Sequence, residues 1–191
     1  PIPTGEDWNR IAYQEGRVLD DMTFDESYDF PWANKTPIAV FRGASTGCGV
    51  TPETNIRIRL AKMSLAGKKD SDDLLFLDAG ISEWNLRSRK LQGEKYLRTI
   101  EVDKLGIPLV PRMSPEDQSH FKYIINVDGH VSAFRLSREL NMGSVVLLAE
   151  SEYKMWFHPL LVPFEHYVPV KSDLSDLFDQ IKWCKAHDTE C

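Results

Sequence analysis

The hydrophobic residues of the chain form short apolar runs, separated by segments in which apolar residues recur at helical spacing. Uninterrupted runs of this length are typical of strands that are buried on both faces of a parallel sheet. Four such runs predict strands, at residues 38–41, 74–77, 123–127 and 144–148, and the segment 165–170 precedes the last helix. Because the strands alternate with helical segments, the pattern predicts an α/β fold with a parallel, doubly wound sheet flanked by helices.

Three helical segments accompany these strands. Pro52 and Glu53 suit the first turn of the helix that follows the first strand. Residues 132–140 carry good helix formers, and Ser172 or Asp173 is expected to cap a last helix. One face of that last helix is predicted to be apolar, with Leu174, Leu177, Ile181 and Cys184.

The 191 residues favour one domain, since a domain averages roughly 150 residues. Residues 1–37 are rich in acidic residues, aromatic residues and prolines, with one weakly helical stretch over 8–19. We predict that they form a lead-in segment packed on the core, and that residues 38–191 form the domain itself. The chain begins without Met or an apolar signal segment, so we expect it to be part of a larger protein.

Charge excludes some functions. The chain has 23 Lys and Arg against 29 Asp and Glu, a net charge of −6. An acidic balance argues against a general nucleic-acid binder, so any phosphate site must be local. The longest apolar stretch, residues 145–149, is too short to cross a membrane, and no membrane contact is expected in this segment.

Metal and thiol chemistry have little support. The three cysteines contain no C-x-x-C pair, and the five histidines are scattered along the chain. The sequence Asp70-Ser71-Asp72-Asp73 resembles the D-x-D pattern with which some sugar transferases hold a metal and a diphosphate, but a solvated loop is the simpler interpretation. Cys48 has no evident histidine partner. We therefore expect no metal site.

A glycine-rich segment follows the first strand and is the strongest candidate for anion binding. Glycines there allow backbone N–H groups to approach an anion before the next helix begins. Arg42 adds a charge, Ser45 and Thr46 add hydroxyl groups, and Gly43 and Gly47 give the backbone freedom. The segment has neither the lysine of a P-loop nor the G-x-G-x-x-G spacing, and a plain turn would explain it equally well.

A second loop has the same character. Asn126, Gly129, Ser132 and Arg135 follow the strand at 123–127, again at a strand end that precedes a helix. Ligands of open α/β sheets bind at the carboxyl ends of the strands, so both loops are expected at one crevice. Arg42 and Arg135 would then meet one diphosphate there.

Several blocks together resemble glycosyltransferase family 90, the protein O-glucosyltransferase and capsule-associated family. The most specific are the block from Tyr123 to Arg135 and the His-Tyr-Val-Pro-Val-Lys-Ser-Asp-Leu block at 166–174. The family order is kept over nearly the whole chain by further blocks at residues 30–32, 39–46 and 77–79.

This resemblance implies a metal-independent enzyme with two lobes of GT-B type. Such an enzyme transfers glucose or xylose from a UDP-sugar to a hydroxyl group of a protein or glycan, and needs no further cofactor. The chain would be the Rossmann-like lobe that binds the nucleotide sugar, and the catalytic base would lie in the other lobe. Eukaryotic relatives imply the secretory pathway, but a cytoplasmic location stays open.

The resemblance also suggests roles for individual residues. Arg42 and Arg135 are expected on the diphosphate, with Gly43, Ser45, Thr46 and Gly47 as donors. Asn126, Gly129 and Ser132 are expected beside the base and ribose. Asp78, at a strand end, is a further candidate for a sugar or ribose hydroxyl, but it could equally cap the next helix. The glycine-rich loop lacks the second arginine of the protein O-glucosyltransferases, and Arg57 or Arg59 is a candidate to replace it.

Two other functions are compatible with the sequence. One is a non-catalytic module that binds nucleotide sugars or another protein. The other is a nucleotide-dependent oxidoreductase, which the missing G-x-G-x-x-G disfavours.

Overall fold

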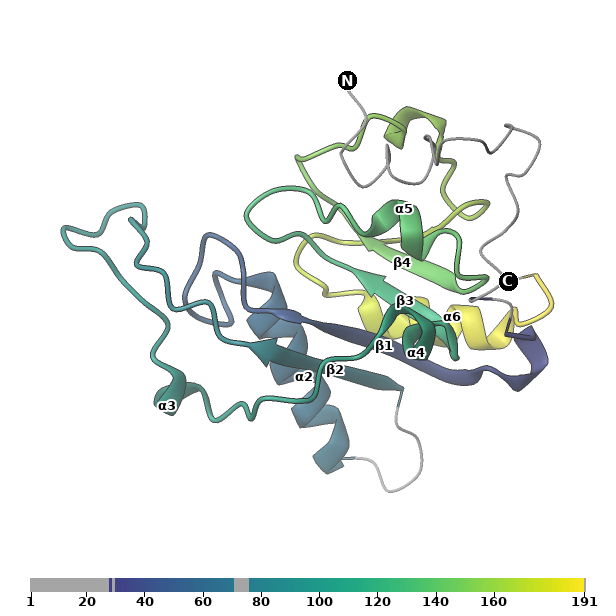
Figure 1. Cartoon of the computed structure of the whole chain (residues 1–191), viewed down its shortest axis with the longest axis horizontal. Coiled ribbons are helices and arrows are strands. Elements are labelled where there is room, and N and C mark those ends of the chain that lie inside the picture. Colours follow the sequence, from purple (N-terminus) through teal and green to yellow (C-terminus); the bar gives the residue numbers. More distant parts are fainter. Residues whose placement is uncertain (1–27, 29, 71–75, 191) are drawn as a thin grey trace, which may run out of the picture.

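The computed structural model describes residue 28 and residues 30–70 and 76–190. Its centre is one sheet of five parallel strands, which confirms the predicted α/β fold (Figure 1). The strands are β1 (Thr36–Ala44), β2 (Leu77–Glu83), β3 (Phe121–Asn126), β4 (Val145–Ala149) and β5 (Val168–Val170). Their order across the sheet is β2-β1-β3-β4-β5, so β1 and β3 are neighbours. After β1 the chain continues to the edge formed by β2, and after β3 it continues through β4 to the edge formed by β5.

Two helices cover one face of the sheet. Helix α2 (Ile56–Asp70) connects β1 to β2, and α6 (Leu177–Ala186) follows β5. Both pack on the side chains that alternate strand positions direct to this face, such as Phe41, Tyr123 and Leu147. The predicted apolar face of the last helix is confirmed, because Leu174, Leu177, Ile181 and Cys184 are all buried in this core.

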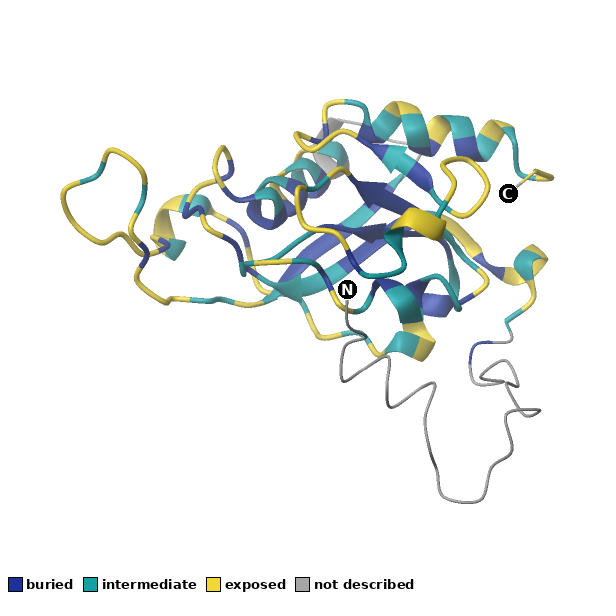
Figure 2. Cartoon of the chain, turned by 90° about the horizontal axis from the view of Figure 1, so that it is seen from above, coloured by how far each residue is buried: buried dark blue, intermediate teal, exposed yellow. Residues whose placement is uncertain are grey.

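The opposite face is covered by shorter elements. The single-turn helix α5 (Leu136–Glu139) buries Leu136 against Val146 and Leu148 of β4. Tyr28 packs on the same face of the sheet, against Val40 and its neighbours. The sheet thus lies between two layers, with its buried strands in the middle (Figure 2).

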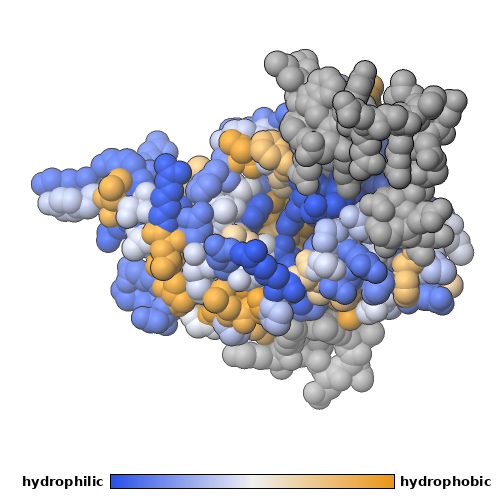
Figure 3. Space-filling view, viewed as in Figure 1, coloured by the Kyte–Doolittle hydropathy of each residue, from blue (hydrophilic) through white to orange (hydrophobic). Residues whose placement is uncertain are grey.

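The connection from β2 to β3 is the longest. Residues 84–110 leave the sheet as an arm with an isolated antiparallel bridge between Arg89 and Arg98 (Figure 1). The arm's surface is mostly hydrophilic (Figure 3). It contains α3 (Val102–Leu105), and α4 (Pro115–Ser119) leads into β3. No helix in the described part of the chain combines the length and the apolarity needed to cross a membrane.

Strand β2 differs from its prediction. It begins at Leu77 and continues through Asp78, Ala79 and Gly80, which the apolar pattern assigned to the loop after the strand. Gly80 is an interior strand position because Val110 lies against it: a Cβ there would come within 2.4 Å of the valine side chain. The first part of the expected strand falls mostly on residues 71–75, which lie outside the described residues, as does the expected helix over 8–19.

The helices begin later than the sequence suggests. Helix α2 begins at Ile56, after a turn at residues 51–54, and not at Pro52. Helix α6 begins at Leu177, because Asp173 accepts a hydrogen bond from the Ser175 N–H at 3.0 Å and Asp176 accepts one from the Lys171 N–H at 2.9 Å. Such bonds between side chain and backbone compete with helix formation. Helix α5 has only four residues where nine were expected.

The loop between β1 and α2 requires a glycine at position 49. A Cβ there would lie 2.0 Å from the carbonyl oxygen of Thr54, a backbone atom that cannot move aside. Gly67 of α2 is the matched control, since a Cβ there would have no atom within 4 Å. We expect Gly49→Ala to lower the free energy of unfolding by about 2–3 kcal/mol in a urea titration. Gly67→Ala should raise it by about 0.5–1 kcal/mol. Equal stabilities of the two variants would contradict this account of the loop.

Candidate functional site

The candidate site lies where the carboxyl ends of β1 and β3 separate. The ladder between the two strands ends at Val40 and Ile124, while β1 continues along β2 as far as Ala44. The connection after β1 runs to one edge of the sheet and the connection after β3 to the other. Open α/β sheets bind their ligands in the crevice that such a reversal creates.

Arg57 of α2 joins the two strand ends. Its guanidinium donates hydrogen bonds to the carbonyl oxygens of Ala44 at 3.1 Å, Val127 at 3.2 Å and Asp128 at 2.8 Å. Burial, together with the nearby charge of Arg135, lowers the pKa of Arg57 to about 10, so it stays charged at neutral pH. Arg57 therefore places a fixed cation between β1 and β3.

The two predicted loops meet at this edge, as expected. A Cβ at Gly129 would lie 2.6 Å from the Thr46 hydroxyl and 3.3 Å from a guanidinium nitrogen of Arg57. Only a residue without a side chain fits there unless these groups move. The close contact brings the glycine-rich loop of β1 against the loop that follows β3.

Arg135 is the second cation of the site. Its Nη1 donates to the Arg42 carbonyl oxygen at 2.8 Å, and its guanidinium lies 4.9 Å from the centre of the Phe41 ring. Arg57 lies 5.8 Å from the same ring. Nitrogens of both guanidinium groups are 3.5 Å from the position that a Cβ at Gly43 would occupy. Phe41 and Gly43 therefore bring two like charges close together.

Arg42 takes a different position from the one expected. Its guanidinium forms an ion pair with the Asp78 carboxylate at 2.6 Å and donates to the Asp78 carbonyl oxygen at 2.7 Å. Both groups belong to β2, on the side of β1 that faces away from β3. The structure thus brings Arg135 together with Arg57, and it joins the expected site residues Arg42 and Asp78 to each other. Arg59 binds carbonyl oxygens of residues 52, 53 and 173.

The glycine-rich loop presents backbone donors. The N–H groups of residues 46–49 donate no hydrogen bond to any described residue. Gly47 has φ +137°, a conformation that favours glycine. Successive free N–H groups of this kind attract anions. The Ser45 hydroxyl is already used, because it is buried and accepts a hydrogen bond from the Asn85 N–H at 2.8 Å.

Asn55 holds this loop in place, and the sequence analysis did not single it out. Its Nδ2 donates to the carbonyl oxygens of Ser45, Thr46 and Gly49 at 3.1–3.4 Å. Its Oδ1 accepts from the N–H groups of Arg57 and Ile58, which caps α2. An asparagine directly before an apolar periodic run is a helix-capping signal that could have revealed it.

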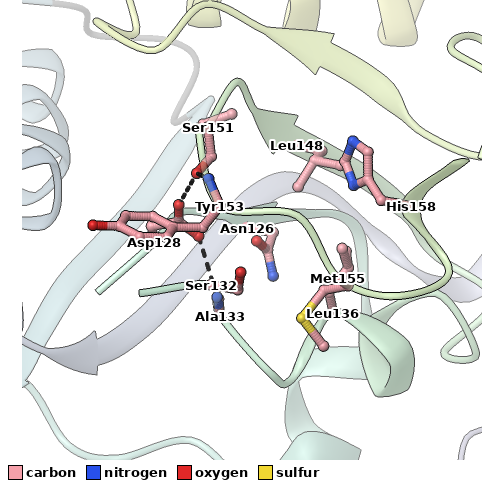
Figure 4. A pocket seen from close by; sticks show the side chains of 11 residues that line it. Asn126, Asp128, Ser132, Ala133, Leu136, Leu148, Ser151, Tyr153, Met155 and His158 are labelled. Carbon is pink, nitrogen blue, oxygen red and sulfur yellow. Dashed lines mark hydrogen bonds between the residues drawn. The ribbon is translucent and has the colours of Figure 1, made fainter. Parts of the chain in front are cut away.

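A pocket lies beside the arginines, at the carboxyl ends of β3 and β4 (Figure 4). The predicted residues Asn126 and Ser132 line it, together with Tyr153 and His158. Asp128 also lines it and accepts hydrogen bonds from the Ser151 hydroxyl and the Ala133 N–H. The sequence analysis did not select Asp128, Ser151, Tyr153 or His158, since the last three come from a loop without a recognisable motif.

The site is locally basic in an acidic chain. Burial lowers the pKa of His130, and the charges of Arg89, Arg87 and Arg57 lower it further.

Within the described part of the chain, no group of three or more histidines, cysteines or acidic residues could hold a metal ion. Ser71, Asp72 and Asp73 of the D-x-D pattern lie outside that part.

Comparison with known proteins gives relatives of two kinds. Uncharacterized protein 179R of Invertebrate iridescent virus 6 is 45% identical over all of this chain, which spans 19% of that protein. Protein O-glucosyltransferase 2 of Danio rerio is 48% identical over 99% of this chain, and Protein O-glucosyltransferase 3 of Homo sapiens is 35% identical over 83%. The chain spans 33% and 26% of these two enzymes.

The model of the family described as Glycosyl transferase family 90 matches residues 8–191. The match covers the glycine-rich loop, both arginines of the crevice and the pocket. Because it also covers nearly the whole chain, the protein belongs to glycosyl transferase family 90.

Proposed function

We propose that this chain is the donor-binding lobe of a glycosyltransferase. The enzyme transfers a sugar of the glucose or xylose type from a UDP-sugar to a hydroxyl group of a protein or glycan acceptor. The observation that carries the proposal is the pair of Arg57 and Arg135 at the crevice between β1 and β3. Two adjacent cations match the charge of a diphosphate. Relatives named protein O-glucosyltransferases support the reaction class.

The diphosphate fits against the free N–H groups of residues 46–49 and the exposed part of Arg135. Arg135 keeps 19% of its side-chain surface exposed, and its Nη2 makes no hydrogen bond to any described residue. Arg57 contributes its positive charge without a direct contact to the phosphates, because its nitrogens are already bonded to carbonyl oxygens. We therefore propose that Arg135 and the loop contact the diphosphate directly.

The uridine is assigned to the pocket at the ends of β3 and β4. The cavity volume of this pocket is about 20 Å³, and a space of that size holds about one water molecule. A nucleoside would therefore lie across its mouth, against the exposed Tyr153, and not inside it. Ser132 and Asp128 offer polar atoms in the lining of the same pocket.

The chemistry expected of this lobe is stabilisation of the leaving group. When the bond between sugar and phosphate breaks, negative charge grows on the departing UDP. Arg57, Arg135 and the loop N–H groups are fixed in position before the reaction, so they stabilise this charge without rearranging. The acceptor hydroxyl must lose its proton to a base, and we assign no residue of this chain to that role.

Arg135→Ala tests the contact with the diphosphate. A charge-assisted contact is worth about 1.5–3 kcal/mol, so we expect UDP affinity to fall roughly tenfold to a hundredfold. Arg135→Lys should restore part of it, because lysine keeps the charge but lacks the planar fork. Calorimetric titration of the intact protein measures both variants, with uridine as the ligand that lacks phosphate. Wild-type UDP affinity in a well-folded Arg135→Ala variant would exclude Arg135 from the site.

Asn55→Asp tests the loop. Aspartate keeps the oxygen that caps α2 but loses the amide donors to the three loop carbonyl groups. We expect UDP affinity to fall by about tenfold, because the loop must then be ordered by the ligand. Circular dichroism should show unchanged helix content. An unchanged Kd for UDP would mean that the loop does not contact the phosphates.

Metal independence is tested on the intact protein. The arginines supply the positive charge that a divalent cation supplies in other transferases, so we expect glycosyl transfer to survive EDTA. Abolition by EDTA with rescue by Mn²⁺, together with loss on Asp72→Ala, would contradict this. UDP-sugar binding without any transfer would instead favour the non-catalytic module.

A further inference from the structure

A buried carboxylate holds Arg135. Glu139 is only 1% exposed, and its Oε1 lies 2.7 Å from Nε of Arg135 in an ion pair one helical turn away. Its Oε2 accepts a hydrogen bond of 2.6 Å from Nδ2 of Asn126, the last residue of β3. The carboxylate therefore connects the arginine to the end of a central strand.

Burying the Glu139 carboxylate is energetically unfavourable, because the carboxylate loses its hydration. Burial raises the pKa of Glu139, while the charges of Arg135, Arg138 and Arg57 and the bond from Asn126 act in the opposite direction. An apolar residue could fill such a site without the loss of hydration that a buried ion suffers. The single turn of α5 already has Leu136 as its packing residue. The carboxylate therefore needs an explanation other than stability.

The contacts of Arg135 suggest that explanation. Glu139 forms an ion pair with Nε, and the Arg42 carbonyl oxygen accepts a hydrogen bond from Nη1. The Phe41 ring covers one face of the guanidinium. Nε lies in the ion pair without donating a hydrogen bond, and Nη2 donates none to any described residue, so Nη1 is the nitrogen with a hydrogen bond in the described chain. Three fixed contacts thus determine which edge of the guanidinium faces the crevice.

We propose that Glu139 is a positioning residue, which orients Arg135 toward the diphosphate of the bound nucleotide. The inference rests on the proposed function, since it needs an anion in front of Arg135. It adds that affinity for the phosphates depends on a carboxylate that does not touch them. Asn126, expected from the sequence to lie beside the base, acts in this arrangement as the anchor of that carboxylate.

Removing the charge of Glu139 distinguishes two explanations, because they predict opposite changes in UDP affinity. Glu139→Gln keeps the size of the side chain and removes its negative charge. If Glu139 affected UDP only through its charge, the loss of a nearby anion would strengthen UDP binding. If it positions Arg135, the variant should bind UDP about tenfold more weakly, with uridine affinity unchanged, because an arginine that is no longer held must be ordered on binding.

The experiment is calorimetric titration of UDP and uridine into the intact protein. Glu116→Gln is the matched control, because it removes the same charge from an exposed residue on α4 and should leave both affinities unchanged. Glu139→Asp is the second variant if the glutamine variant does not fold. It keeps the charge but shortens the reach to Nε, and it should also weaken UDP binding.

A double-mutant cycle shows whether Glu139 affects UDP binding through Arg135. In an Arg135→Ala background, Glu139→Gln should cause no further loss of UDP affinity, since residues that act as one unit are not additive. Unchanged or stronger UDP binding by Glu139→Gln would overturn the inference. An additive loss in the double variant would overturn it as well. Failure of the proposed function is seen separately, because Arg135→Ala alone would then leave UDP binding intact.

Discussion

The hydrogen bonds of Arg57 to three backbone carbonyl groups are the contacts on which the rest of the site depends. Where β1 and β3 separate, the carbonyl oxygens of Ala44, Val127 and Asp128 face a gap instead of a neighbouring strand. Buried carbonyl groups without partners are costly, and one planar guanidinium satisfies all three. The same side chain therefore closes the end of the sheet and leaves a positive charge there. No carboxylate of the described residues forms an ion pair with it.

The other arginines of this edge show how the charge is distributed. Arg42 forms an ion pair with Asp78, so its charge is largely neutralised by a contact that joins β1 to β2. Arg135 is paired with Glu139, but its guanidinium remains partly exposed and close to Arg57. A chain with a net charge of −6 thus keeps one small region positive. This local excess is what an acidic protein needs in order to bind a diphosphate without attracting polyanions in general.

The sequence predicted the sheet well because strands that are buried on both faces leave a clear apolar signature. It predicted the helix starts poorly, since these depend on particular bonds of Asn55, Asp173 and Asp176 to nearby backbone groups. The arginines show the same limit. Arginines in the two loops that follow strands predicted a cationic crevice, but whether Arg42 or Arg57 joins Arg135 depends on which side of β1 each side chain lies. That is a property of the packed sheet, and a sequence pattern does not contain it.

Most polar side chains around the crevice are already bonded within the protein, and this defines what remains for a ligand. Ser45 binds Asn85, Asn126 binds Glu139, and Asp128 binds Ser151. These bonds fix the loops before any ligand arrives, so little ordering is left to oppose binding. Among the described residues, the N–H groups of residues 46–49 and Nη2 of Arg135 donate no hydrogen bond. Backbone donors held in this way suit the anion that we propose as the ligand, and of the two hydroxyl groups expected to bind it, that of Ser45 is bonded to Asn85 instead.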